Sequence, residues 1–124
     1  MKYVLVLALL IFLSVPAWAK HLHKESVYQM HWCSANRGLT EYILDDKTRI
    51  DCLTQTHAIE FDFANKWAES IGQSLYYGLK TQRTPGIVLI IENPEKDGKY
   101  VKRLEQVANK FGITYWLMYS AELD

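Results

Sequence analysis

The most informative part of the sequence is residues 49–63, which read Arg-Ile-Asp-Cys-Leu-Thr-Gln-Thr-His-Ala-Ile-Glu-Phe-Asp-Phe. Its last six residues alternate between apolar and acidic or small side chains, which is typical of a β-strand with two different faces. Residues 49–53 contain β-branched and apolar side chains, and the polar residues 54–57 favour a turn. The stretch therefore predicts two paired strands joined by a short turn.

The predicted turn determines which acidic side chains face each other. If residues 54–57 close it, Asp51 stands directly opposite Glu60, with Cβ atoms about 5 Å apart. Asp62 lies two residues beyond Glu60 and therefore on the same face. Carboxylates this close repel unless a cation lies between them, and hard oxygen ligands select Mg²⁺, Mn²⁺ or Ca²⁺. Asp51, Glu60 and Asp62 are candidate metal ligands; a solvated acidic face is the alternative.

The rest of the chain predicts helices and strands on either side of this pair. Helical periodicity and stop signals mark the helices, and runs of apolar residues mark the strands. Helices are expected over residues 25–36, 65–80 and 99–111, and strands over 39–44, 49–53, 58–63, 87–91 and 113–119. The order αβββαβαβ predicts an α/β domain with a mixed central sheet flanked by helices.

The predicted helix over residues 65–80 carries two stripes. The apolar stripe consists of Trp67, Ala68, Ile71, Leu75 and Leu79. The polar stripe consists of Lys66, Glu69, Ser70, Gln73 and Tyr77. Apolar stripes of this spacing are typical of a core-facing surface, and the polar stripe lies on the opposite side. Lys66, just past the acidic strand, could orient a nucleophile or stabilise phosphate charge; a solvated helix face is the alternative.

The first residues indicate export. Lys2 precedes an apolar run over residues 4–15, and Pro16 precedes Ala17-Trp18-Ala19, the small-residue pattern that signal peptidase accepts. We expect a signal peptide over residues 1–19, cleaved after Ala19, and a periplasmic or secreted protein without stable membrane insertion. An uncleaved anchor is the alternative.

The overall composition is that of one globular domain. The chain has 124 residues, 49% of them hydrophobic and 23% charged, with 14 basic and 14 acidic side chains. Disordered, collagen-like and multi-domain classes are excluded. Loss of residues 1–19 leaves a near-neutral domain over residues 20–124, which is not suited to strong nonspecific binding of nucleic acid.

The two cysteines of the chain are Cys33 and Cys52. Because an exported protein meets an oxidising compartment, a disulfide between them is the expected pairing. Closing a loop of about 19 residues would contribute about 3 kcal/mol. Two buried free thiols are the alternative.

In this context the acidic strands resemble the PD-(D/E)xK nuclease superfamily, within it the RecB-like and Holliday-junction-resolvase-like members. Asp51, followed by Glu60 and the two residues after it, resembles the superfamily signature on the second and third strands. Gln73 and Tyr77 resemble a Q-x-x-x-Y motif on the next helix. The resemblance implies a restriction-endonuclease-like core, a metal-dependent nuclease using Mg²⁺ or Mn²⁺ held by Asp51 and Glu60, and positioning of the nucleic acid or the site by Gln73 and Tyr77.

The sequence departs from the signature at Asp62, where the superfamily has its catalytic lysine. The resemblance implies that Lys66 is the migrated lysine; if Lys66 cannot act, the alternative is a catalytically inactive binding module for nucleic acid or a protein partner in the cell envelope. DNA is the expected nucleic acid, Arg49 is a candidate phosphate contact, and a homodimer is possible in this class.

One further acid is left open. A first-helix acid often completes the superfamily's site, and Glu25 is the positional candidate. A three-residue turn at residues 45–47 would instead put Glu41 opposite Asp51, whereas a two- or four-residue turn would put Tyr42 there. Glu41 ranks slightly above Glu25, and the sequence does not decide between them.

Overall fold

The computed structural model describes residues 20–124, so the predicted signal peptide lies outside the described residues. No helix in this part of the chain is long and apolar enough to cross a membrane. The elements in chain order are α1 (Glu25–Ala35), β1 (Leu39–Ile43), β2 (Arg49–Leu53), β3 (His57–Phe63), the short 3₁₀ helix η1 (Ala64–Lys66), α2 (Trp67–Thr81), β4 (Thr84–Ile91), α3 (Pro94–Phe111), β5 (Thr114–Tyr119) and the 3₁₀ helix η2 (Ser120–Leu123).

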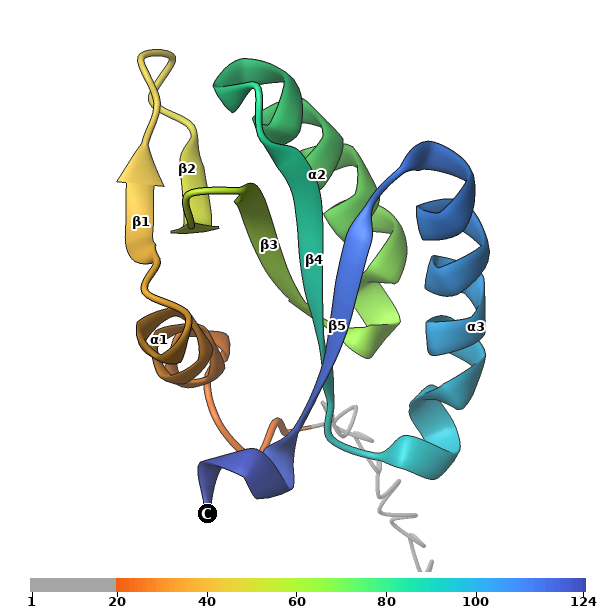
Figure 1. Cartoon of the computed structure of the whole chain (residues 1–124). Coiled ribbons are helices and arrows are strands. Elements are labelled where there is room, and N and C mark those ends of the chain that lie inside the picture. Colours follow the sequence, from red (N-terminus) through yellow and green to blue (C-terminus); the bar gives the residue numbers. More distant parts are fainter. Residues whose placement is uncertain (1–19) are drawn as a thin grey trace, which may run out of the picture.

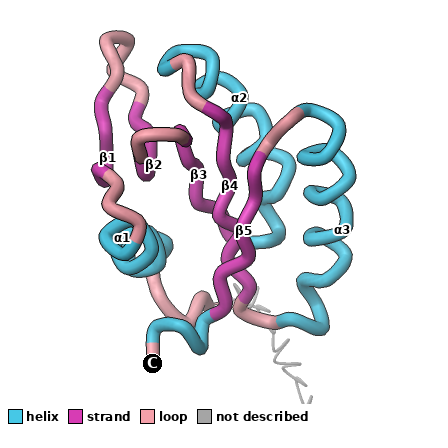
Figure 2. The backbone as a smooth tube through the Cα atoms, viewed as in Figure 1, coloured by secondary structure: helices cyan, strands magenta, loops and turns pink. Residues whose placement is uncertain are grey.

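The strands form one five-stranded sheet in the order β1-β2-β3-β4-β5 (Figure 1). The pairs β1–β2 and β2–β3 are antiparallel, and the pairs β3–β4 and β4–β5 are parallel. Helices α2 and α3 cover one face, and α1 lies on the other (Figures 1 and 2). The predicted α/β domain with a mixed sheet flanked by helices is confirmed.

Strand β3 is central, and its alternation separates two environments. Ile59, Phe61 and Phe63 pack into a core under α1, while Glu60 and Asp62 point to the other face, where α2 lies. Both acids are nevertheless buried. The sequence pattern therefore places carboxylates inside the domain, beneath a helix.

The predicted strand pairing is confirmed at the second hairpin, and the structure decides the turn of the first hairpin, which the sequence leaves open. Leu53 pairs with Ala58, as the turn over residues 54–57 requires. The first turn is the three-residue form, because the Leu44 N–H donates to the Thr48 carbonyl at 2.8 Å. This turn selects the register that places Glu41 opposite Asp51.

The expected disulfide is present between Cys33 of α1 and Cys52 of β2, with Cα atoms 5.8 Å apart. Both side chains are fully buried. Gly38 passes directly beside the bond, and a Cβ there would lie 2.4 Å from the Cys52 Sγ. The disulfide therefore ties α1 to the hairpin at a place where only glycine fits.

The predicted apolar stripe of helix α2 packs against the core at Trp67 and Ile71, but the second half of the helix presents a different face to the sheet. Ser70, Ser74 and Tyr77 are buried, whereas Leu75 and Leu79 are 38% and 76% exposed. The serine hydroxyls donate to carbonyls of their own helix, at 2.7 and 3.0 Å, so their burial leaves no unmet polar group. Small side chains let α2 approach the acidic face of β3 closely, and this packing outweighs the apolar periodicity.

Candidate functional site

The site forms where β2 separates from β3. The ladder between these strands ends at Cys52 and Ile59. Two residues beyond Ile59, the Phe61 N–H donates to the Asp51 carboxylate at 2.8 Å. Asp51 thus inserts its side chain between the two strands and meets Glu60 there, as the predicted register requires.

Glu60 is the most enclosed acid of the site, with 4% of its surface exposed. Its Oε1 atom is buried and has no hydrogen-bond partner. Burial, together with the neighbouring charge of Asp51, raises the pKa of Glu60 to about 10. Burial also raises the pKa of Asp51, against the hydrogen bond from Phe61 that favours its ionised form. The positive charge of Arg49 favours the ionised form of Asp51 but does not overcome the effect of burial.

Two further acids face this pair. Burial and the charge of Glu25 raise the pKa of Asp62 to about 7. Burial and the charge of Asp51 likewise raise the pKa of Glu25 to about 7. The positive charge of Lys66 opposes both shifts. Glu25, at the start of α1, and Lys66, at the end of η1, therefore act on the same group of acids.

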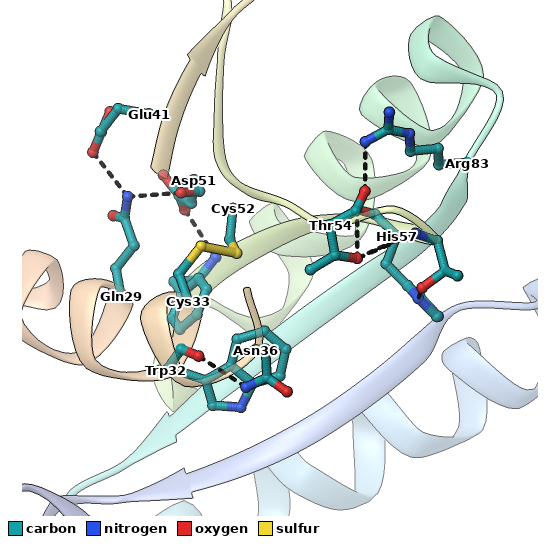
Figure 3. The surroundings of a disulfide bond; sticks show 12 residues. Gln29, Trp32, Cys33, Asn36, Glu41, Asp51, Cys52, Thr54, His57 and Arg83 are labelled. Atoms are coloured by element: carbon teal, nitrogen blue, oxygen red, sulfur yellow. Dashed lines mark hydrogen bonds between the residues drawn. A yellow bond between two sulfur atoms is a disulfide. The ribbon is translucent and has the colours of Figure 1, made fainter. Parts of the chain in front are cut away.

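Glu41 borders this group but is held by partners of its own (Figure 3). Its Oε1 accepts from the Gln29 amide at 3.0 Å, and its Oε2 pairs with Arg49 at 3.2 Å. Arg49 is mostly exposed. Since the charge of Glu41 is partly balanced and that of Glu25 faces the other acids, the geometry makes Glu25 the stronger candidate of the two.

Gln29 is a site residue that sequence reasoning missed. Its side chain is 3% exposed and donates to both the Asp51 carbonyl, at 2.8 Å, and Glu41 (Figure 3). A signal was present in the sequence: Glu25, Gln29 and Cys33 are spaced by four residues and share one face of a helix. Because Cys33 was expected to pair with a cysteine beside Asp51, that face had to meet the acidic hairpin.

The residues predicted from the helix motif lie at different depths. Tyr77 is 6% exposed, and burial next to Glu60 raises its pKa. Gln73 is exposed to solvent and forms no hydrogen bond among the described residues. The structure thus brings together Asp51, Glu60 and Asp62 with Tyr77, and leaves Gln73 on the outer surface of α2.

In residues 20–124, no three side chains of His, Cys, Asp or Glu come close enough together to hold a metal ion as they stand. Mg²⁺, however, commonly uses one or two carboxylates and completes its shell with water and substrate phosphate. Asp51 and Glu60 fit that smaller requirement, because they are hard oxygen donors and one oxygen of Glu60 is buried without a partner. These two carboxylates are the residues that would hold the cation.

Comparison with known proteins gives no relative. No protein-family model matches the chain, and neither a search of curated proteins nor a search of solved structures finds a match. The function is therefore argued from the geometry of the site.

Proposed function

We propose that this protein is an exported, metal-dependent nuclease that hydrolyses phosphodiester bonds of nucleic acid, with a restriction-endonuclease-like core. The observation that carries the proposal is the meeting of Asp51 and Glu60 at the open end of the β2–β3 ladder, where one buried oxygen of Glu60 has no hydrogen-bond partner. A fold does not retain mutually repelling buried acids for stability, since each raises the cost of ionising the other. Such a pair is suited to binding a cation.

The roles of the residues follow from their positions. Asp51 and Glu60 would hold Mg²⁺ or Mn²⁺, which when bound would lower the pKa of a water molecule and polarise the phosphate. Lys66 lies beside Asp62 and Glu25 at the margin of the site, where its ammonium group can stabilise the negative charge that grows on the phosphate oxygens. Hydrolysis then adds water across one P–O bond and leaves a phosphate on one fragment and a hydroxyl on the other.

Export belongs to the same proposal. The pattern of residues 1–19 supports a cleaved leader, and the disulfide between Cys33 and Cys52 suits an oxidising compartment. DNA is the proposed substrate, and a homodimer is the proposed way for so small a domain to enclose a duplex.

The test is digestion of single- and double-stranded DNA and RNA by the purified, oxidised protein with Mg²⁺ or Mn²⁺. Glu60→Gln and Lys66→Ala should each abolish cleavage, while Lys110→Ala, an exposed lysine at the far end of α3, should leave it unchanged. Cleavage that survives Glu60→Gln would come from a contaminant and would refute the assignment.

A catalytically inactive binding module is the second candidate. Asp62 occupies the place of the superfamily's lysine, and this observation favours it. Binding of nucleic acid without cleavage, by a protein that Mn²⁺ nevertheless stabilises, would select this candidate over the nuclease.

A further inference from the structure

A separate pocket of about 750 Å³ opens beside the acidic site. It lies at the carboxyl ends of the parallel strands β3 and β4, where the chain turns into η1 and α3. Crevices at the carboxyl ends of parallel strands are the usual ligand sites of α/β sheets. Apolar side chains of the two strands, Phe63 and Ile90, line it, and Tyr100 of α3 adds an aromatic ring.

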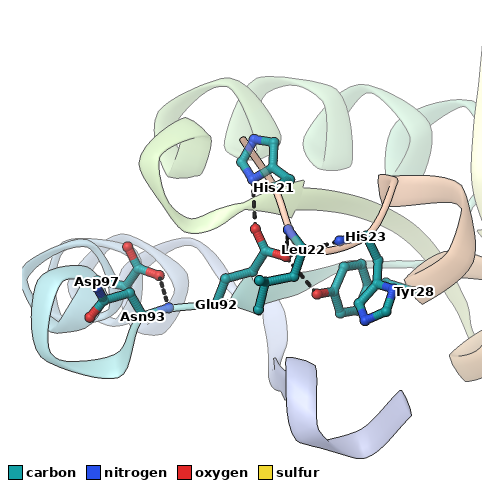
Figure 4. A network of polar contacts seen from close by, with 7 residues as sticks. All are labelled: His21, Leu22, His23, Tyr28, Glu92, Asn93 and Asp97. Carbon is teal, nitrogen blue, oxygen red and sulfur yellow. Dashed lines mark hydrogen bonds and ion pairs between the residues drawn. The ribbon is translucent and has the colours of Figure 1, made fainter. Parts of the chain in front are cut away.

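One wall of the pocket is the segment before α1, which a single carboxylate holds in place (Figure 4). Glu92 accepts from the His21 ring at 2.7 Å, from the Leu22 N–H at 2.9 Å and from the Tyr28 hydroxyl at 2.7 Å. The His21 ring also stacks on Phe63, with centroids 3.5 Å apart. These hydrogen bonds fix the wall as an ordered part of the fold, and they use the carboxylate oxygens of Glu92 as acceptors.

Besides Glu92, the charged residues that line the pocket are three lysines and one further acid, Asp97. Lys20, Lys66 and Lys96 line it, one from each surrounding segment. Among the described residues none of the three forms an ion pair. Asp97 also lines the pocket, and its carboxylate accepts from the Asn93 N–H at 3.1 Å, as part of the first turn of α3. The three ammonium groups outnumber the two carboxylates, which favours a ligand with more than one negative charge.

We propose that this pocket binds the terminal phosphate of a nucleic-acid strand, so that the protein acts from strand ends. A terminal phosphomonoester carries nearly two negative charges, as a phosphorylated side chain does, against one for an internal diester. The volume of the pocket suits one nucleotide, whose apolar surface would lie against Phe63 and Tyr100.

The proposal rests on the proposed nuclease function through Lys66. This lysine lines the pocket and also faces Asp62 and Glu25. A strand end held by Lys20 and Lys96 therefore brings its following phosphodiester bonds toward the acidic site. Endonucleolytic attack far from an end would not use the pocket.

The test measures binding without catalysis. Fluorescence anisotropy compares single-stranded DNA oligonucleotides of one sequence that carry a 5′-phosphate, a 3′-phosphate or neither, in the absence of divalent cations. We expect one phosphorylated form to bind about fivefold or more tighter than the unphosphorylated form. Lys96→Ala should remove most of this preference, whereas Lys110→Ala, an exposed lysine of the same helix outside the pocket, should keep it.

The outcomes separate this inference from the proposed function. Equal binding of all three oligonucleotides, or a preference that Lys96→Ala leaves intact, would overturn the pocket assignment even if the protein cleaves DNA. A preference lost in Lys96→Ala, in a protein that cleaves nothing when Mn²⁺ is added, would support the pocket and overturn the nuclease. Whichever phosphorylated oligonucleotide binds more tightly shows whether the pocket takes the 5′ or the 3′ end of the strand.

Discussion

Replacing Glu60 by glutamine should stabilise the protein at alkaline pH. The pKa of Glu60 rises from an ordinary 4.5 to about 10 on folding, so the folded state takes up a proton that the unfolded chain lacks between these values. Stability therefore falls as pH rises through this window. At about pH 8, keeping Glu60 protonated lowers the free energy of unfolding by about 5 kcal/mol if the group titrates alone, because each unit between the ordinary pKa and this pH costs about 1.36 kcal/mol. Because Asp51 shares the proton, we expect Glu60→Gln to gain about 2–4 kcal/mol at this pH.

Urea unfolding followed by tryptophan fluorescence measures this gain, in EDTA, at about pH 5 and about pH 8. A glutamine amide can donate to Asp51 as the protonated acid does, so the packing is kept. The gain should nearly vanish at about pH 5, where wild-type Glu60 is protonated at little cost. Asp45→Asn, which removes one exposed charge in the first turn, is the control and should change stability by less than about 0.5 kcal/mol at either pH. A Glu60→Gln protein that is less stable at about pH 8, or equally stabilised at both values, would refute the buried, repelling pair.

Three other outcomes follow from the structure. At about pH 8, Mn²⁺ at about 100 times its Kd should add about 2.7 kcal/mol to the free energy of unfolding, and Asp51→Asn should abolish this gain in the same urea titration; an equal gain in the variant would place the cation elsewhere. Reducing the disulfide should cost about 3 kcal/mol, and a reduced protein as stable as the oxidised one would contradict its structural role. Leu79→Ser should cost less than about 0.5 kcal/mol because Leu79 is exposed, whereas Ser74→Leu should cost about 2 kcal/mol by overpacking. Thermal denaturation measures both changes, and a larger loss for Leu79→Ser than for Ser74→Leu would mean that the apolar stripe faces the core.

The acidic strand was predictable because its signals are local. The alternation over residues 58–63 determines which side chains share a face, and the turn over residues 54–57 sets the partner of Asp51. The disulfide could be expected from the two cysteines and the export signal. These inferences need only periodicity, turn length and the compartment.

The orientation of α2 was not predictable from periodicity. An apolar stripe predicts that Leu75 and Leu79 face the core, but the surface available to the helix is the polar side of β3. Ser70 and Ser74 can lie there because they bond to their own helix. The preference depends on the partner surface, which a window of sequence does not contain.

The contacts of Glu92 were beyond the sequence for a different reason. His21 and Glu92 are 71 residues apart, and no local pattern links them, since only the assembled sheet and helices bring them together. For Gln29, the spacing of Glu25, Gln29 and Cys33 indicates the helix face that meets the acidic hairpin, but not the hydrogen bond to the Asp51 carbonyl. The choice between Glu25 and Glu41 depends on contacts of the same kind, because Arg49 and Gln29 hold the Glu41 carboxylate.

The disulfide has a mechanical role because of the place where the β2–β3 ladder ends. Beyond Cys52 the pairing of the two strands stops, and only two residue pairs hold them together on the other side. The bond from Cys52 to Cys33 fastens β2 to a helix that packs on β3, so a covalent link adds to this short row of hydrogen bonds. The disulfide therefore helps to fix the position of Asp51 relative to Glu60.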